Sequence, residues 1–319
     1  MRIKELFNFF IEAGIEKDPR GKDFVLSLLA ENKQKHSKLS EEEKQDYDSE
    51  KLSNPFLDSR VLFGDKSAEV KSIMVGIDIE TPELLLANTL RANGRVIDLV
   101  ITHHPEGVAY ATFYRVMEMQ ADILHKFGVP INIAEPLVDS RLKEVGRKVM
   151  PQNHLRSVDA AKLLGIPFMS AHTVADNHVA THLQSIFDKI PHKTLGDIVK
   201  TLEAMPEYKD AKINGAGPRI VNGSKESRTG KIFVDMTGGT EGPKEVIEKL
   251  SAAGVGTIVG MHMSEDHLKE LKKHNINLVI AGHISSDNLG LNLMLDDAEA
   301  KFGRIETVEC SGFRRFRRN

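Results

Sequence analysis

The sequence predicts an α/β protein made of two related α/β lobes with mainly parallel sheets. Short apolar runs, typical of strands buried on both faces, alternate with segments whose apolar residues recur at helical spacing. One strand–helix–strand unit also occurs twice, starting at Ile73 and again at Ile232. Strands joined by one helix in this way lie parallel, because the right-handed connection packs back onto the sheet.

The composition fits a folded protein with a substantial core. Of its 319 residues, 40% are hydrophobic and 28% are charged, which excludes a disordered, a collagen-like or a coiled-coil chain. The formal net charge of −3 argues against a surface built to grip nucleic acid. The one cysteine, Cys310, cannot form an internal disulfide and fits a reducing compartment. Without a signal-peptide pattern or an apolar run of the roughly 18 residues of a membrane span, we expect a cytoplasmic protein and no membrane partner.

Residues 1–65 predict a charged helical N-terminal extension. Apolar residues between Leu6 and Ile15 recur at helical spacing and form one stripe that needs a packing partner. The segment 31–51 consists mainly of Lys, Glu, Gln, Asp and Ser, so it is either a solvated helix or a mobile linker.

The first strand–helix–strand unit begins with the apolar strand 72–79. Thr81-Pro82-Glu83 then starts a helix, because threonine can cap it, proline suits its first turn and the acid lies at the positive end of the helix dipole. The helix ends near Asn93-Gly94, and a second strand over 96–102 runs into two adjacent histidines.

The second unit repeats this order. A strand over 231–237 is followed by a helix through Leu250 and a strand over 255–259, and His262 stands where the first unit has its histidines. This agreement indicates two related lobes, although two ordinary units could also agree by chance. The other predicted helices cover 113–127, 140–148, 157–164, 178–190, 195–205, 266–274 and 288–302, and the other predicted strands cover 130–133, 167–171, 276–281 and 305–310.

Histidines and aspartates follow three of the predicted strands. Ligands of parallel sheets bind beyond the carboxyl ends of the strands, so these residues are expected to meet. Two of the three groups are His–Asp pairs four residues apart, a spacing that brings both side chains to one face of a helical turn. The groups are His103 with His104, His172 with Asp176, and His283 with Asp287.

These residue types point to a divalent metal. Imidazole and carboxylate suit Zn²⁺, Fe²⁺ or Mn²⁺, and one cysteine excludes a four-thiolate site. Adjacent His103 and His104 diverge on an extended backbone and suit one ion each, with carboxylates bridging two ions. Two alternatives stay open. The His–Asp pairs could cap helices or bond backbone groups, and His178 and His182 could either form another site with Asp176 or be ordinary residues of a helix face.

The tail, residues 313–319, carries four arginines and two phenylalanines. It could contact nucleic acid through phosphates and base stacking, or it could form ion pairs between subunits or stay solvated. In a chain that is acidic overall the second interpretation is favoured, so a nucleic-acid partner is not expected but stays open.

Four stretches of the chain carry a family resemblance. They are IDIETPELLLANTLRANGRVIDLVITHHP, AHTVAD, DMTGGTEG with its Gly-Gly turn, and AGHISSDNLGLN. In this order and spacing, over about residues 71–318, they resemble the NIF-three-like (NGG-one-interacting-factor-three-like) family, also known as GTP cyclohydrolase I type 2.

The resemblance implies a dinuclear centre of divalent metal ions (Zn, Fe or Mn) in a cleft between the lobes, and a toroidal homohexamer. By position, the metal ligands would be His103, His104, Asp176, His283 and Asp287. His172 matches a family residue beside the metals, and we assign it a catalytic role in orienting a ligand or contacting substrate. The implied function is a metal-dependent hydrolase of the GTP cyclohydrolase I type 2 kind, which acts on a nucleotide or similar small molecule through a metal-activated water. The alternative is a non-enzymatic, ring-shaped adaptor or DNA-associated protein with structural metals.

Three features depart from the family pattern. Asp287 stands where the family usually has glutamate, so a bridging role needs a closer backbone. Val259-Gly260-Met261-His262 replaces the family's Thr-Gly-Asp, and the charged N-terminal segment is longer than in the shorter family members.

These observations predict three regions of the chain. Residues 1–65 form the N-terminal extension. Residues 66–177 together with 275–319 form the metal-binding α/β lobe, and residues 178–274 form the second α/β lobe.

Overall fold

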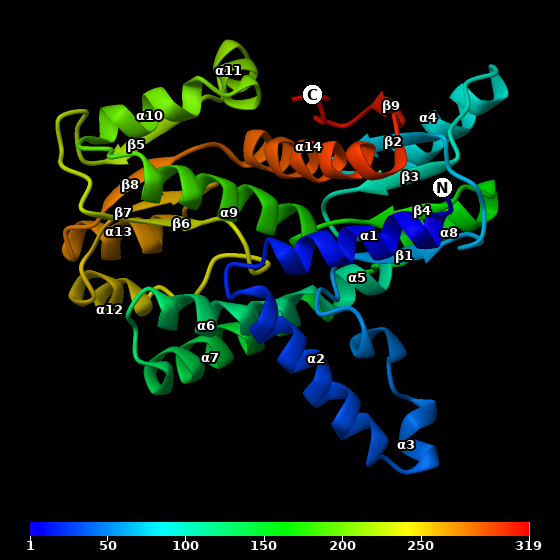
Figure 1. Ribbon diagram of the computed structural model, residues 1–319, viewed down its shortest axis with the longest axis horizontal. Helices are drawn as coiled ribbons and strands as arrows, with labels where there is room; N and C mark the ends of the chain where they lie inside the picture. The colour runs from blue at the N-terminus through cyan, green and yellow to red at the C-terminus, as the bar shows by residue number, and fades with distance from the viewer. Residues whose placement is uncertain (319) are drawn as a thin grey trace.

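The computed structural model describes residues 1–318 and contains two β-sheets flanked by helices (Figure 1). The first sheet has five strands in the order β1-β4-β3-β2-β9, and the second has four in the order β5-β8-β7-β6. The first sheet consists of β1 (Arg60–Phe63), β2 (Ser72–Gly76), β3 (Leu99–Thr102), β4 (Phe168–Ser170) and β9 (Glu306–Glu309). The second consists of β5 (Arg219–Asn222), β6 (Lys231–Asp235), β7 (Val255–Gly260) and β8 (Asn277–Ile280). This mixed α/β architecture with mainly parallel strands confirms the predicted fold class.

The two sheets share one plan. In each, an edge strand, β1 or β5, pairs antiparallel with its neighbour, and three parallel strands follow. The two units predicted as a repeat stand at corresponding places, with α4 (Thr81–Ala92) between β2 and β3 and α12 (Val246–Ala252) between β6 and β7. This shared order supports two related lobes over a chance agreement. The first sheet has one strand more than the second, because β9 pairs with β2.

Two long helices, α9 (Thr173–Lys189) and α14 (His283–Phe302), lie side by side at the centre of the molecule (Figure 1). Each begins directly after a parallel strand, α9 after β4 and α14 after β8. They approach closely at Gly290 of α14, where a Cβ atom would lie only 2.4 Å from the carbonyl oxygen of Ala175 in α9. A side chain at this position would therefore separate the helices, and glycine brings their first turns together.

The remaining helices surround this arrangement. They are α1 (Ile3–Glu16), α2 (Lys22–Ser37), α3 (Glu41–Gln45), α5 (Gly107–Thr112), α6 (Met119–Lys126), α7 (Ile131–Val149), α8 (Arg156–Leu164), α10 (Leu195–Glu203), α11 (Pro206–Ile213) and α13 (Glu265–Lys273). Two 3₁₀ helices, η1 (Ser49–Leu52) and η2 (Phe113–Glu118), join some of them. Across residues 1–318, no helix combines the length and the apolarity needed to cross a membrane.

Helix α1 buries the apolar stripe predicted for it. Leu6 and Phe10 are at most 1% exposed and belong to the core of the first sheet, together with Val174 of α9. Helices α2 and α3 instead extend away from the body (Figure 1), and in this arm only Val25 and Leu29 of α2 are buried. The arm is helical and largely solvated, which is one of the two predicted alternatives.

The packing of the two sheets is the basis for a proposed division of the chain into lobes. A boundary before residue 275 separates β8 from the second sheet, in which it pairs with both β5 and β7. The expected extension 1–65 includes α1 and β1, which pack and pair within the first lobe. Helices α6 and α7 lie in the predicted first lobe, yet their apolar residues pack in the core of the second sheet. We therefore propose to group β8, α6 and α7 with the second lobe, and α1 and β1 with the first.

One predicted strand is wrong. The stretch 130–133 leads into α7, and the predicted helix 140–148 is the second half of that same helix. Ile131, Ala134 and Val138 recur at helical spacing and pack in the core of the second sheet, so a long helical stripe outweighs the short alternation that suggests a strand. The edge strands β1 and β5 are mostly half-buried or exposed and give no strong apolar signal, so the sequence did not predict them.

The arginine-rich tail forms ion pairs within the chain. The side chain of Arg315 is only 2% exposed and lies 2.7 Å from Asp296 and 3.0 Å from Glu299. Arg318 pairs with Glu207 at 2.7 Å. Neither predicted interpretation of the tail includes this arrangement, which uses these two arginines to hold the C-terminus against acids of the same chain.

We expect Arg315→Met to lower the free energy of unfolding by about 3–5 kcal/mol, because Asp296 and Glu299 then lose their buried cation. Chemical denaturation followed by circular dichroism measures the change. The control is Arg304→Met at an exposed position, which should shift stability by less than about 0.5 kcal/mol. Equal stability of the two variants would contradict the prediction.

Candidate metal centre

The structure brings all six predicted site residues together at the carboxyl ends of the strands. His103 and His104 directly follow β3, whereas the two His–Asp pairs occupy the first turns of α9 and α14. Because these two helices touch near their starts, their carboxylates reach the same space beyond β3. The α9 pair is His172 with Asp176, and the α14 pair is His283 with Asp287.

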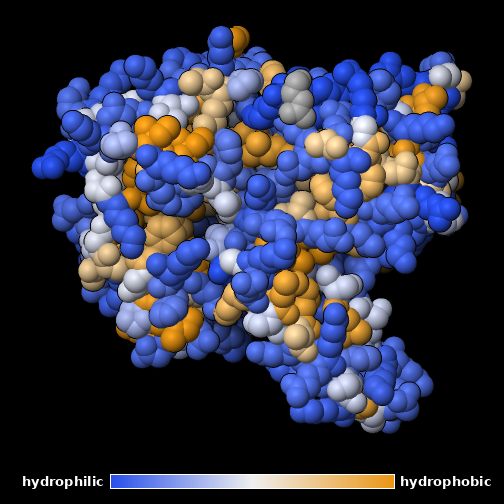
Figure 2. Space-filling model, in the orientation of Figure 1, coloured by the Kyte–Doolittle hydropathy of each residue, from blue (hydrophilic) through white to orange (hydrophobic). Residues whose placement is uncertain are grey.

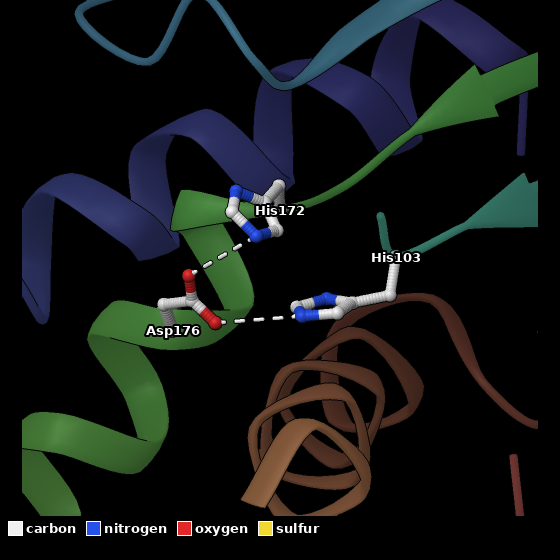
Figure 3. A group of neighbouring side chains, drawn as sticks. All are labelled: His103, His172 and Asp176. Carbon is white, nitrogen blue, oxygen red and sulfur yellow. Dashed lines mark ion pairs between the residues drawn. The ribbon is translucent and has the colours of Figure 1, made fainter. Parts of the chain in front are cut away.

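Asp176 lies between two imidazole rings (Figure 3). Its Oδ1 atom is 3.5 Å from Nε2 of His103, and its Oδ2 atom is 3.6 Å from Nε2 of His172. These separations exceed the usual length of a hydrogen bond, which is about 2.7–3.2 Å. The three side chains face one another without bonding directly, and together they form a group that could hold a metal ion.

Asp287 faces imidazole nitrogens with both of its oxygens. Oδ1 is 3.5 Å from Nε2 of His103, while Oδ2 is 3.6 Å from Nε2 of His104 and 3.7 Å from Nε2 of His283. Asp287 with His103 and His104 forms the second group that could hold a metal ion. The two groups share His103 and lie side by side.

Several polar atoms of this cluster are buried without a partner. Among the described residues, Nε2 of His103, Oδ1 of Asp176 and both carboxylate oxygens of Asp287 have no hydrogen bond. His103 is fully buried and Asp287 is 1% exposed. Leaving buried polar and charged groups unsatisfied costs stability, so an arrangement that gathers four such atoms calls for a cation. The nitrogen and carboxylate donors fit a divalent metal ion.

Hydrogen bonds on the outer side of three imidazoles set their proton positions. Nδ1 of His103 donates to the carbonyl oxygen of Ala171 at 3.1 Å. Nδ1 of His104 donates to Asp78 at 2.7 Å, and Nδ1 of His172 donates to Asp58 at 2.8 Å. A carbonyl oxygen and an ionised carboxylate can accept a hydrogen bond but cannot donate one. Each Nδ1 therefore carries the proton. In the neutral form of each ring, Nε2 then presents its lone pair to the cluster, as a metal ligand requires.

The pKa values of the cluster residues are shifted in different directions. Burial, with neighbouring imidazoles, lowers the pKa of His283 to about 4, so this ring is neutral at pH 7. Burial raises the pKa of Asp176 to about 6. For His172, burial is outweighed by Asp176 and Asp58, which raise its pKa to about 9. In the metal-free protein, a proton is therefore held at His172 beside Asp176, and a bound cation would compete with it.

Asp58 and Asp78 are functional residues that the sequence analysis missed. Asp78 lies two residues beyond β2, so the rule of looking past strand ends could have found it. Asp58 stands in the predicted extension, outside any motif. Besides His172, it accepts a hydrogen bond of 2.6 Å from the hydroxyl of Thr173, and this bond ties the start of α9 to the segment before β1.

We expect Asp58→Asn to lower the pKa of His172 by about 1 or more, because the variant removes a carboxylate that stabilises the charged imidazole. Titration of the histidine resonances of metal-free protein by NMR measures it. Asp139→Asn changes an exposed aspartate of α7 and should leave that titration unchanged. If His172 titrates alike in all three proteins, Asp58 does not set its charge.

The alternative site around His178 is not assembled. Its Nδ1 atom bonds the carbonyl oxygen of Val174 within α9, and its Nε2 atom faces Asp297 at 3.6 Å. Asp176 faces His103 and His172 instead. His178 is therefore a buried residue of the α9–α14 contact.

The wall opposite the cluster comes from the second lobe. The ring of His262 lies 4.9 Å from that of His283, measured between centroids. Its Nδ1 atom lies 3.3 Å from Glu241, whose carboxylate also accepts a hydrogen bond from the backbone nitrogen of Ser264. The histidine that the repeat predicts after β7 thus faces the cluster.

A solved structure described as a NIF3 superfamily protein, from Sphaerobacter thermophilus, matches this fold. It is 28% identical, the TM-score is 0.69, and the alignment covers 81% of this chain and 92% of that one. The chain has the NIF3 superfamily fold. This finding confirms the resemblance seen in the four sequence stretches.

Two other solved structures match with lower scores. Reduced HcgD from Methanocaldococcus jannaschii is 14% identical with a TM-score of 0.46, and covers 79% of this chain and 88% of its own. The Staphylococcus aureus hypothetical protein SA1388 is 12% identical with a TM-score of 0.46 and the same coverage. No protein-family model and no curated protein matches the chain.

Proposed function

We propose that this NIF3-like protein binds two divalent metal ions and hydrolyses a nucleotide or a similar small molecule. The observation that carries the proposal is the position of Asp287, whose two buried oxygens lack hydrogen bonds and face imidazole Nε2 atoms on both sides. A carboxylate that offers one oxygen to each of two neighbouring groups suits a shared ligand of a two-metal site.

The ligand sets follow from the facing atoms. One ion would be held by His103, Asp176 and Oδ1 of Asp287, and the other by His104, His283 and Oδ2 of Asp287. The aspartate that replaces the family's glutamate still faces both sides, because the close contact of α14 with α9 brings its backbone near. The donors suit zinc, iron or manganese.

Bound ions would supply a water of lowered pKa as a nucleophile for an electrophilic carbon of the substrate. His172 is placed to handle the proton. Its Nδ1 is held by Asp58, so its Nε2 can accept a proton at the edge of the cluster and return it to a leaving group. Asp176 Oδ2 lies 3.6 Å from the same Nε2 atom.

Partial exposure of two histidines favours a catalytic over a purely structural metal site. The side chain of His104 is 29% exposed and that of His283 is 40% exposed, and a small cavity opens beside the cluster. Structural sites are closed, whereas catalytic sites keep a position open for water or substrate. A ring-shaped adaptor with structural metals remains the alternative outcome of the experiment below.

The test is to purify the untagged protein without chelator, count its metal by mass spectrometry, and assay GTP and other nucleotides. We expect two ions per chain and turnover in the wild type, and neither in the double variant His103→Ala, His283→Ala. A wild type that holds two ions but turns over none of the nucleotides would contradict the hydrolase. Sedimentation of the same samples tests the homohexamer that the resemblance implies.

A further inference from the structure

A second, much larger cavity lies on the second lobe. Its volume is about 790 Å³, and it is bounded by β6, α9, α6 and α12. Apolar side chains supply much of its lining, and Figure 2 shows apolar residues in a recess on this side of the molecule. They include Ile123, Leu124, Phe127, Phe187, Phe233 and Val246. Cavities of about 300–1,000 Å³ with apolar walls and a few polar groups are typical of small-molecule sites.

This cavity adjoins the small cavity beside the candidate metal centre. The small cavity is lined by His172, Asp176, His283 and Asp287 on the side of the cluster. On its other side it shares six lining residues with the large cavity, namely Asp235, Met236, Thr237, Gly242, Met263 and His267. The large cavity therefore borders the space beside the cluster along these residues.

Asp235 is the acid among the six lining residues that the two cavities share. It is half-buried at the carboxyl end of β6, and its carboxylate has no hydrogen bond or ion pair with any residue of the described chain. His267 uses both ring nitrogens, one on the hydroxyl of Ser264 and one on the carbonyl oxygen of Gly242. Burial raises the pKa of Asp235 to about 6, so it is ionised at pH 8.

The other two acids of the large cavity have partners. Asp18 pairs with Arg20, and Asp188 accepts a hydrogen bond from Gln184. The ammonium group of Lys231 donates to the carbonyl oxygen of Phe127. Asp235 differs from these groups because it lines the cavity and its carboxylate oxygens accept no hydrogen bond from the described chain.

The packing of the fold does not require a carboxylate at this strand end. In the first lobe the last residue of β2, Gly76, corresponds to Asp235 as the last residue of β6. A Cβ atom on Gly76 would lie 2.5 Å from Ile79, so that position is closed. In the second lobe the equivalent position has room for a side chain, and an aspartate occupies it.

We propose that the large cavity binds the organic body of the substrate, a planar and largely apolar group whose N–H donors or amidinium-like cation are accepted by Asp235. Ionised carboxylates are acceptors with two oxygens, and they match paired N–H donors. The reacting end of the same molecule would extend to the His/Asp cluster, and this second part rests on the proposed hydrolase function. Binding in the cavity does not require metal.

The experiment uses benzamidine and acetophenone, two probes that share a ring but differ in N–H donors. Ligand-detected NMR titrations at pH 8 are run on metal-loaded and on chelator-treated protein. We expect benzamidine to bind with a Kd of about 1 mM in both. Asp235→Asn, which preserves shape, should weaken benzamidine at least about tenfold and leave acetophenone within about twofold. Asp188→Asn, on the same cavity but partnered by Gln184, is the matched control and should change neither.

A crystal soaked with benzamidine locates the probe. Density in the cavity, with the amidine against Asp235, supports the proposal. Absence of binding at about 20 mM, equal affinity of the Asp235→Asn variant, or density elsewhere overturns it. Because binding to the chelated protein is measured in parallel, failure of the untreated protein to hold metal or to turn over a nucleotide would refute the proposed hydrolase while leaving the cavity result intact.

Discussion

Replacing Asp287 with alanine will abolish binding of both metal ions. The side chain faces Nε2 of His103 through one oxygen and Nε2 of His104 and His283 through the other, so both proposed ligand sets lose a member at once. We expect the metal content to fall from two ions per chain to none, with an affinity loss of more than about 100-fold. Metal analysis after dialysis and calorimetric titration of chelator-treated protein measure both quantities.

The same variant separates metal binding from folding. For the wild type, metal at about 100 times its Kd should add about 2.7 kcal/mol per bound ion to the free energy of unfolding, because the ions bind only the folded chain. The Asp287→Ala protein should gain nothing, and Asp139→Ala, which changes an exposed aspartate, should respond like the wild type. A variant that keeps one tightly bound ion would show that Asp287 is not shared between two.

Replacing His172 with glutamine will remove turnover but not the metal. The ring is held by Asp58 on Nδ1 and presents Nε2 beside Asp176, a placement suited to moving a proton. We expect turnover of the nucleotide that the proposed assay finds to be a substrate to fall by about 10²–10⁴-fold, which is the usual contribution of a general acid–base group. Both ions should remain, since neither proposed ligand set includes this residue.

The matched control is His182→Gln, a half-buried histidine of the same helix outside the cluster. It should keep both turnover and metal. Loss of one ion from His172→Gln would instead make His172 a ligand, consistent with its place in the group formed with His103 and Asp176. The pH profile gives an independent measure, because the limb that reports the proton acceptor should disappear in His172→Gln alone.

Much of this site could be predicted because its determinants are local. The i, i+4 spacing of His172 with Asp176, and of His283 with Asp287, sets both side chains on one helical face whatever the rest of the fold does. The apolar strands before them place these helices at the carboxyl ends of parallel strands. By contrast, the stretch 130–133 misled the prediction, since four residues do not distinguish a strand from the first turn of a longer helix.

The residues that orient the site could not be predicted in the same way. Asp58 and His172 are far apart in sequence, and their hydrogen bond exists only because the segment before β1 packs against the start of α9. Asp235 is an ordinary strand-end residue in the sequence. The proposed role of Asp235 comes from its place in the lining of two cavities, and cavities depend on how the lobes pack.

The sequence by itself determined the repeated α/β units and the identity of the six residues at the strand ends, because these follow from short-range periodicity and spacing. It did not fix the starts of α9 and α14, which begin at Thr173 and His283, ahead of the predicted starts at 178 and 288. Only the tertiary structure decided that Asp287 turns one oxygen to each side, that three imidazoles point their lone pairs inward, and that an unpaired acid faces the large cavity. The physical reason is that orientation and burial arise from contacts between segments distant in the chain, such as Gly290 on Ala175, which no local pattern encodes.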